Sequence, residues 1–416
     1  MLLRTAAGAD LLILDDLGSE FNSSFLISTL YSLLNNRLGA KLPTIVTTNI
    51  TDGALLEKLY TEKSPAASPL LSPSSLWATI FGRKRQKKRK WDRSQREFLF
   101  RKGISNMGIV VIGAVFVDIK GYPLSTYIPG GRNAGRIEQV HGGVSRNVAE
   151  DIANVELRPT FVGLVDDTGM GQDVINKLDN HKVNTRYIQK VPDGMGTWLA
   201  IFDNDGDVHA AISKRPDTTP LTTLLEEKGD EIFKDCDAIA IELDLEKDTV
   251  KQVLRYAKKY NKKVFAAVSN MSIAMERRDY LQQIDCFVCN QQEAGLLFSD
   301  DYEHLAPSRM AQVLARNVHS ANMTSMVVTM GGQGAVYAKH TGECGVVPAK
   351  KVDVIDTTGA GDAFFAGTVI GPTYGKNLAQ SCEIGSRLAA SVICITENVC
   401  PRFRPLEFGL DVPVVD

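Results

Sequence analysis

The stretch DTTGAGDAFFAG, from Asp356 to Gly367, places a glycine-rich turn directly before an acid and a run of small apolar residues. The run predicts a helix, and the first backbone N–H groups of a helix lack partners and carry positive partial charge. Gly359, Ala360 and Gly361 can therefore donate hydrogen bonds to a phosphoryl group in transfer. Asp362 stands at the mouth of this anion hole, where we expect it to accept a proton from an attacking hydroxyl. The alternative is an acid that only caps the helix.

The complete string resembles the C-terminal signature of the PfkB (ribokinase-like) family of sugar and nucleoside kinases. The resemblance covers about residues 107–410 and recurs at four other places in the expected order. It implies a ribokinase-like α/β fold, a three-layer α/β/α sandwich with a mostly parallel central sheet and a small β lid. It also implies ATP-dependent transfer of the γ-phosphoryl group to a primary hydroxyl of a sugar or nucleoside. Relatives often bind a monovalent cation, such as K⁺, where Asp356 and Thr358 lie here.

The first of these places is the apolar run Ile109–Val117, which predicts a buried strand ending at Asp118. An acid just past the C-terminal end of a strand faces the ligand crevice of an open α/β sheet. In the resembled family this Asp holds sugar hydroxyls. A solvated loop acid is the alternative.

The second place is the segment His141–Asn147, HGGVSRN. The glycine pair Gly142 and Gly143 lets a ligand approach the backbone closely, and Asn147 offers a donor and an acceptor to vicinal hydroxyls. The family uses this pair and this Asn to bind the sugar. The form GGVxRN resembles that of pseudouridine kinases, which makes pseudouridine the expected substrate and Arg146 a residue for substrate choice. The alternatives are a ribokinase- or fructokinase-like sugar kinase and, for Arg146, a surface side chain.

The third place is the segment Cys286–Glu293, which matches the NxxE motif of the family. There Asn290 and Glu293 organise Mg²⁺ and its waters near the phosphates, in keeping with the preference of Mg²⁺ for few carboxylates and retained waters. Cys286 and Cys289 form a CxxC pair, but no second Cys or His pair lies at ligand spacing. We interpret them as small apolar side chains of a buried strand rather than as a zinc or redox site.

The fourth place is a pair of predicted strands, Met326–Met330 and Ala335–Ala338, joined by a tight glycine-rich turn. In the family this turn lies along the nucleotide, with the Thr at the strand end near the phosphates. The resemblance thus assigns ATP contacts to Thr329, Gly331, Gly332 and Gly334, with Asn290 beside them. A purely steric glycine turn is the alternative.

A lid is expected from residues 197–215, which alternate like a strand pair around Asp205 and Gly206. Family members use strands here and around residues 118–140 to cover the sugar, often also to form a homodimer. Closure would exclude the water that competes with the sugar hydroxyl. Trp198 either contacts the substrate or packs under the lid. Residues 265–270, FAAVSN, replace an acidic DP or D-x-N element of many relatives, which leaves the substrate open.

The first hundred residues differ in character from the rest. Residues 8–60 resemble the Walker B and sensor-1 strands of AAA+ helicase loaders, but no Walker A loop is present, so we interpret residues 1–62 as an inactive β-α-β remnant. Residues 63–106 form a Pro/Ser-rich and basic linker, and residues 107–416 the kinase domain. The alternative from another class is a nucleic-acid-associated loader or adaptor with a degenerate kinase domain.

Composition favours a cytoplasmic enzyme that acts on small molecules. The chain has 416 residues, a net charge of −2 and 44% hydrophobic residues, without an apolar stretch of the ~20 residues that span a membrane. Seven cysteines without a regular framework indicate reduced thiols. The near-neutral charge gives no reason to expect nucleic-acid binding. No P-loop or protein-kinase motif occurs, so the phosphates must be held differently and a protein substrate is not expected.

Overall fold

A computed structural model describes residues 12–14, 44–46, 108–204, 208–276 and 278–410. The chain forms two compact units, Met1–Arg101 and Lys102–Asp416. In the first unit, strand β1 (Leu12–Leu14) pairs in parallel with β2 (Thr44–Val46), the two strands expected of the β-α-β remnant. The helix expected between them, the linker and the basic run lie outside the described residues.

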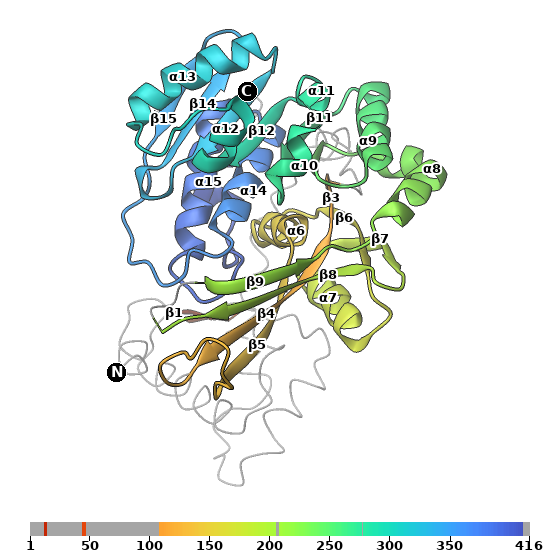
Figure 1. Cartoon of the computed structure of the whole chain (residues 1–416). Coiled ribbons are helices and arrows are strands. Elements are labelled where there is room, and N and C mark those ends of the chain that lie inside the picture. The colour runs from red at the N-terminus through yellow and green to blue at the C-terminus, as the bar shows by residue number, and fades with distance from the viewer. Residues whose placement is uncertain (1–11, 15–43, 47–107, 205–207, 277, 411–416) are drawn as a thin grey trace. The chain divides into compact units, whose positions relative to one another are not determined.

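The second unit is built on a nine-stranded sheet (Figure 1), in the order β15-β14-β13-β12-β11-β10-β3-β6-β7. Every neighbouring pair from β13 to β7 is parallel, whereas β14 and β15 are added antiparallel at one edge. The strands are β3 (Ile109–Ile112), β6 (Thr160–Val165), β7 (Asn184–Lys190), β10 (Ala238–Glu242), β11 (Lys263–Ala267), β12 (Cys286–Asn290), β13 (Ser325–Thr329), β14 (Ala335–Lys339) and β15 (Cys344–Val347). This is the mostly parallel α/β sheet that the sequence predicts.

Helices cover both faces of this sheet, because its central strands are apolar on both sides. In β3, Val110 and Ile112 belong to one core, and Ile109 and Val111 to the other. The first core is closed by α8 (Thr219–Phe233), α9 (Lys247–Tyr260), α12 (Gln291–Phe298) and α13 (Pro307–Ser320), and the second by α6 (Val144–Asn154), α7 (Gly169–Asn180), α14 (Ala360–Thr373) and α15 (Leu378–Val392). Short helices α10 (Met271–Met275) and α11 (Arg278–Leu281) lie between β11 and β12.

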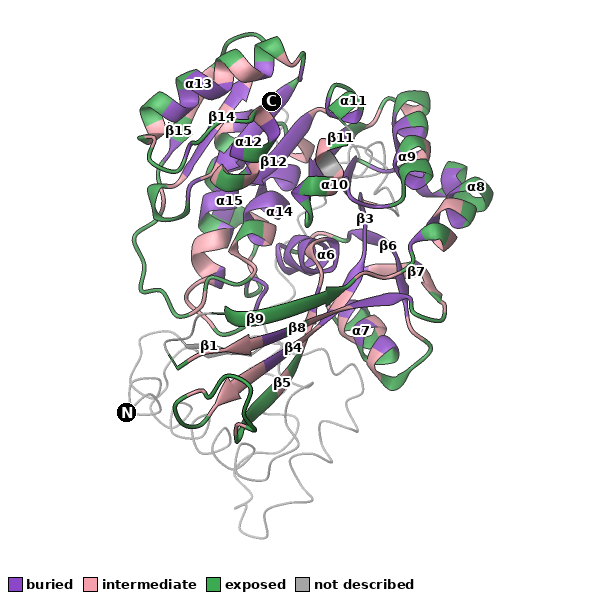
Figure 2. Cartoon of the chain, in the orientation of Figure 1, coloured by how far each residue is buried: buried purple, intermediate pink, exposed green. Residues whose placement is uncertain are grey.

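A second, four-stranded sheet with the order β5-β4-β8-β9 extends from this body (Figure 1). Its strands are β4 (Val115–Pro123), β5 (Gly135–Gly142), β8 (Met195–Phe202) and β9 (Val208–Lys214). The expected strand pair within residues 197–215 is therefore confirmed and joins the strands near residues 118–140. Every residue of β9 is exposed, in contrast to the buried strands of the central sheet (Figure 2). We call this four-stranded sheet the lid.

The apolar run Ile109–Val117 was expected to form one strand, and that expectation is wrong. The run divides at Gly113 and Ala114 into β3 of the central sheet and β4 of the lid. Asp118 consequently lies within β4 and not beyond the end of a strand. Gly113 allows this change of sheet, since a Cβ atom there would meet the Ser145 hydroxyl at 2.0 Å.

The glycine-rich stretch near the C-terminus fixes how α14 packs. Gly359 adopts φ 81° before the helix, a conformation that favours glycine. Further along, a Cβ on Gly367 would lie 2.4 Å from the backbone nitrogen of Gly385 in α15. The two helices therefore touch backbone to backbone, which holds the start of α14 in a fixed place above the sheet. No helix of the described residues is both long and apolar enough to cross a bilayer.

Candidate active site

The site is assembled where two helices begin. Helix α6 starts after Gly143, with φ 98°, and α14 starts after Gly359. Asp362 lies in the first turn of α14 and does not cap it, because no side chain caps this helix. A Cβ on Gly361 would meet no atom within 4 Å, so the backbone there borders open space. The predicted anion hole, Gly359 to Gly361, thus has room for a ligand beside the acid.

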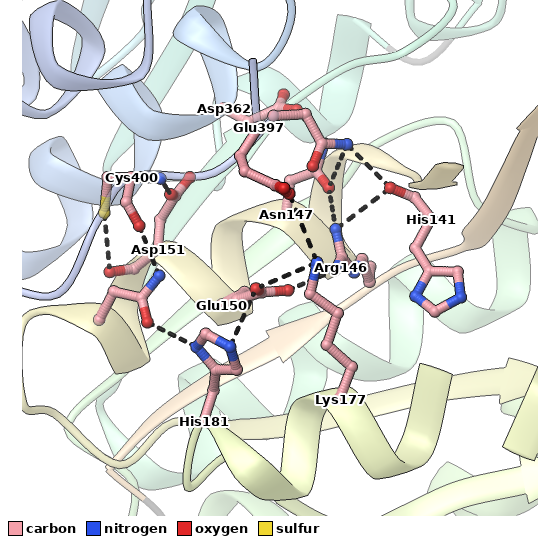
Figure 3. A network of polar contacts seen from close by, with 12 residues as sticks. His141, Arg146, Asn147, Glu150, Asp151, Lys177, His181, Asp362, Glu397 and Cys400 are labelled. Carbon is pink, nitrogen blue, oxygen red and sulfur yellow. Dashed lines mark hydrogen bonds and ion pairs between the residues drawn. The ribbon is translucent and has the colours of Figure 1, made fainter. Parts of the chain in front are cut away.

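Asn147 connects the two helix starts. Its Nδ2 donates a hydrogen bond of 2.8 Å to Oδ2 of Asp362, across 215 residues of sequence (Figure 3). The sequence singled out both residues on separate motifs, and the fold brings them into contact. Asn147 itself is buried, and Asp362 is half-buried.

The surroundings of Asp362 raise its pKa to about 7. Burial of the carboxyl group is the largest cause, and the negative charge of Asp118 adds to it. The hydrogen bond from Asn147 and the charge of Arg146 act in the opposite direction. A carboxylate with a pKa near neutrality suits a general base, because it is ionised at working pH and still binds a proton well.

Asp118 lies directly over Gly142. A Cβ atom on Gly142 would come within 2.5 Å of one carboxylate oxygen of Asp118, so a larger residue at this position would displace the Asp118 side chain. Burial raises the pKa of Asp118, while the charges of Lys120 and Arg146 lower it. Asp118, Gly142, Asn147 and Asp362 therefore lie close together, and their shared role in one site stays a prediction.

Arg146 was expected to bear on substrate choice, and the structure places it where a substrate cannot reach. Its side chain is fully buried, which also excludes the surface alternative. Its guanidinium donates to Oδ1 of Asn147 at 2.7 Å and to the His141 carbonyl at 3.2 Å, and it forms an ion pair with Glu150 (Figure 3). The expectation that Arg146 contacts the substrate is therefore wrong. Arg146 contacts Asn147 instead.

The NxxE motif forms a helix cap. The Glu293 backbone N–H donates to Oδ1 of Asn290, and the Asn290 N–H donates to Oε2 of Glu293, each at 2.8 Å. Burial raises the pKa of Glu293, and the bond from Asn290 lowers it. Cys286 and Cys289 are buried on opposite faces of the sheet, in keeping with their interpretation as core residues.

The glycine-rich turn lies beside the NxxE motif. Strand β13 pairs with β14 in antiparallel fashion around a 3-10 turn at Gly331–Gln333, as the sequence predicts. Thr329 is in register with Asn290 on the neighbouring strand. A Cβ atom on Gly331 or Gly332 would meet nothing within 4 Å, so this backbone is open to a ligand, whereas Gly334 packs against β15.

Asp356 and Thr358 form a local turn ahead of the anion hole. The Thr358 N–H donates to Oδ1 of Asp356 at 2.8 Å. Burial alone would raise the pKa of Asp356, but the bonds from Thr358 and Thr357 and the charge of Lys120 together lower it, so the carboxylate is ionised. Its other oxygen and the neighbouring backbone provide the kind of ligands that a monovalent cation uses.

Two polar residues of the site were missed by the sequence analysis. Glu242 ends buried strand β10 and accepts a 2.8 Å hydrogen bond from the backbone of Ser145 at the start of α6. An acid at the end of an apolar strand was a signal that could have found it. Asn398 donates to the His141 carbonyl at 2.8 Å, 257 residues away, and no local pattern marks it.

Comparison with known proteins decides the family. The sequence model of the pfkB family carbohydrate kinases matches residues 107–397. The chain belongs to this family. It is an ATP-dependent phosphotransferase that acts on a hydroxyl group of a sugar or nucleoside, a small molecule. The match lies outside residues 8–60 and gives no support to their resemblance to helicase loaders.

Curated relatives of this kinase include two nucleoside kinases. It is 34% identical over 292 residues to the guanosine-inosine kinase of Exiguobacterium acetylicum, covering 70% of this chain and 95% of the relative. It is 26% identical over 309 residues to the pseudouridine kinase of Escherichia coli strain K12, covering 70% and 96%. The pseudouridine kinase is thus the more distant of these two.

Solved structures show the same fold. Arabidopsis thaliana ribokinase, complexed with ribose and ATP, aligns with a TM-score of 0.65 at 20% identity, covering 74% of this kinase and 99% of that chain. Ribokinase of Giardia lamblia aligns with a TM-score of 0.64 at 17% identity, covering 73% and 99%. The ribokinase-like fold expected from the sequence is confirmed.

Proposed function

We propose that this kinase phosphorylates the 5′-hydroxyl of a nucleoside, with purine nucleosides and pseudouridine as first candidates. The observation that carries the mechanism is the hydrogen bond between Asn147 and Asp362 at the anion hole. Asp362 takes the proton from the 5′-hydroxyl as its oxygen attacks the γ-phosphorus of ATP, and ADP leaves. The N–H groups of residues 359–361 stabilise the transferring phosphoryl group.

The remaining roles follow the motifs. Asp118, Gly142, Gly143 and Asn147 hold the ribose, whose hydroxyls a carboxylate and an amide can bind. Thr329, Gly331 and Gly332 lie along the nucleotide, with Gly334 shaping the turn. Asn290 and Glu293 would hold Mg²⁺ and its waters, where the ion would neutralise charge on the phosphates. Among the described residues no cluster of three or more acidic, His or Cys side chains could hold a metal.

An aromatic surface beside Asp118 favours a nucleoside over a free sugar. Trp198 is the direct cross-strand neighbour of Asp118 in the lid, so the two side chains share a face. Phe202 lies edge-on to Trp198 at 6.4 Å and stacks on Tyr122 at 4.7 Å. Trp198 is half-buried, and its free surface offers a base a partner for stacking. The 34% identity to a guanosine-inosine kinase supports the same class.

The test is ATP-dependent phosphorylation over a panel of guanosine, inosine, adenosine, pseudouridine, uridine, ribose and fructose, with Mg²⁺. We expect kcat/KM for at least one nucleoside to exceed that for ribose by a factor of about 100 or more. A preference for ribose or fructose would keep the mechanism and overturn the nucleoside. No phosphorylation of any of these compounds would overturn the proposal as a whole.

We further propose a homodimer through the lid. Successive residues of a strand point to opposite faces, so Ile119, Leu199 and Ile212 form a row on the face away from Asp118. Ile212 is 71% exposed, and Ile137, on the same face, 74%. An exposed apolar sheet face beside an edge strand is typical of an interface.

A monovalent cation near Asp356 and Thr358 and a cytoplasmic location, where ATP is at hand, complete the proposal. The ionised, half-buried carboxylate of Asp356 supports the cation. Replacing K⁺ by the larger tetramethylammonium ion should lower kcat if the cation shapes the anion hole. An unchanged kcat would exclude that role.

A further inference from the structure

We infer that Arg146 and Asn398 are positioning residues that hold the side chain of Asn147 in the one orientation in which it donates to Asp362. The inference rests on the proposed role of Asp362 as the base. Neither residue touches the anion hole with its own side-chain donors. Both orient the partner of Asp362 through Asn147, and Arg146 in addition lowers the pKa of Asp362 by its charge.

The chemistry of Arg146 fixes the orientation of the Asn147 amide. A guanidinium has donors and no acceptor, so the group of Asn147 that faces it at 2.7 Å must be the amide oxygen. The amide NH₂ is then left to point at Asp362, where it donates at 2.8 Å. If Asn147 turned over, its NH₂ would face the guanidinium and its oxygen would face the carboxylate. Both contacts would then be repulsive.

Asn398 provides a second donor to the same acceptors. Its Nδ2 donates to the His141 carbonyl at 2.8 Å and to Oδ1 of Asn147 at 3.4 Å. The guanidinium of Arg146 donates to the same two oxygens. The backbone carbonyl of Asn398 also lies where a Cβ of Gly359 would be, at 2.0 Å. Asn398 therefore joins the orientation of Asn147 to the position of the anion hole.

Burial keeps this arrangement rigid. Arg146 is 0% exposed and Asn398 5% exposed, so water cannot replace either donor. Glu150, also fully buried, balances the charge of Arg146 and is contacted in turn by Lys177 at 3.6 Å and His181 at 3.4 Å (Figure 3). A buried ion pair stabilises little by itself, and here it serves to place one donor.

The first experiment replaces the whole ion pair, with Arg146→Met and Glu150→Met together in the full chain. Removing both charges avoids leaving one buried and unpaired. We expect a folded protein whose kcat falls about 10-fold or more, because the base loses its oriented partner. The acid limb of kcat/KM should move to higher pH, because both the Asn147 bond and the Arg146 charge lower the pKa of Asp362. KM for ATP should stay within about twofold of wild type.

Lys177→Met is the matched control, because it changes the same network and leaves the contacts of Asn147 in place. It should keep both kcat and the acid limb. If kcat and the acid limb changed equally in the control and in the double variant, the cause would be a general loss of packing, and the inference would be overturned. A folded double variant with wild-type kcat and acid limb would overturn it as well.

A double-mutant cycle separates action through Asn147 from any other path. In an Asn147→Ala background, adding the Arg146→Met and Glu150→Met pair should lower kcat by less than about twofold further. In the wild-type background, Asn398→Ala should lower kcat, as the Arg146→Met and Glu150→Met pair does. In the Asn147→Ala background, it should leave kcat nearly unchanged. Additive losses would overturn the inference. If Asp362→Asn kept wild-type kcat, the proposed base would fail, independently of the outcome of this cycle.

Discussion

At the scale of single residues, the site depends on one carboxylate whose environment opposes its charge. Asp362 is half-buried and lies near Asp118, and burial of its carboxyl group together with the charge of Asp118 raises its pKa to about 7. The Asn147 hydrogen bond limits that rise and aims the acceptor oxygen. A solvent-exposed Asp that only caps a helix would keep an ordinary pKa. The raised pKa of Asp362 instead suits it to proton transfer.

Replacing Asp362 by Asn should lower kcat by a factor of about 100 to 10,000, the range of a lost general base. The Kd for ATP should change little, because the anion hole is backbone. Stopped-flow or steady-state kinetics of the variant measure kcat, and an ATP titration measures the Kd. Wild-type-like turnover would remove Asp362 from the role of base.

The pH dependence should follow the same group. The base works only when ionised, so kcat/KM should fall by about tenfold per pH unit below pH ~7 and level off above it. Rates between about pH 5.5 and 8, with the fold monitored by circular dichroism, measure this limb. A profile that stays flat down to pH ~5.5 would contradict the raised pKa of Asp362.

At the scale of elements, the starts of two helices meet because glycines permit it. Gly143 and Gly359 adopt positive φ before α6 and α14, and the chain turns into each helix beside a neighbouring backbone. Further along α14, Gly367 and Gly385 allow it to lie directly against α15. The position of Asp362 is therefore set by contacts on the far side of its helix as well as at the site.

Gly367→Ala tests this packing. Its new Cβ would overlap the Gly385 backbone nitrogen, so the helices must separate, at a cost of about 1–3 kcal/mol in the free energy of unfolding. Denaturant unfolding measures the loss. Gly169→Ala is the matched control, since a Cβ at this helical glycine meets nothing within 4 Å, and its stability should be unchanged or slightly higher. Equal stability of the two variants would refute the close contact.

At the scale of the whole molecule, one part of the chain matches nearly the full length of a related kinase. The match to the guanosine-inosine kinase uses 70% of this chain and 95% of that relative. The second compact unit begins at Lys102 and contains every residue of the candidate site. The kinase domain proposed for residues 107–416 is therefore expected to be self-sufficient, and residues 1–106 to be dispensable for catalysis.

A chain of residues 107–416 should fold and keep kcat within about threefold of the full-length protein. Circular dichroism and the same kinase assay on both chains provide the comparison. If the shorter chain folds but has lost activity, the first hundred residues take part in catalysis, and the proposed domain division is wrong.

The lid dimer makes a prediction at the same scale. The substitutions Ile137→Lys and Ile212→Lys would place charges in the proposed interface, so the double variant should be a monomer where the wild type is a dimer. Light scattering coupled to size exclusion gives the mass. Ala211→Lys, on the opposite face of β9 and also exposed, is the control and should remain dimeric. A monomeric wild type would end the dimer proposal.

The motifs were sufficient to predict the family and the fold class, and they named the residues that we propose for the central site. Its motifs combine local geometry with chemistry: glycines at helix starts, an acid after them, and apolar runs of strand length. Asp118, Asn147 and Asp362 come from three such motifs, and only the fold shows that they meet. The motif also predicted that Arg146 bears on substrate choice. That prediction was wrong because the burial of Arg146 is decided by packing around its whole side chain, which a local motif does not reveal.

The contacts between distant segments could not be predicted from the sequence and are seen only in the folded chain. The run Ile109–Val117 divides between two sheets because Gly113 lies against Ser145, a neighbour that periodicity does not reveal. Asn398 reaches Asn147 across 251 residues, without any local signal. Local sequence encodes backbone conformation and polarity, whereas the orientation of Asn147 depends on donors that only close packing brings to its side chain.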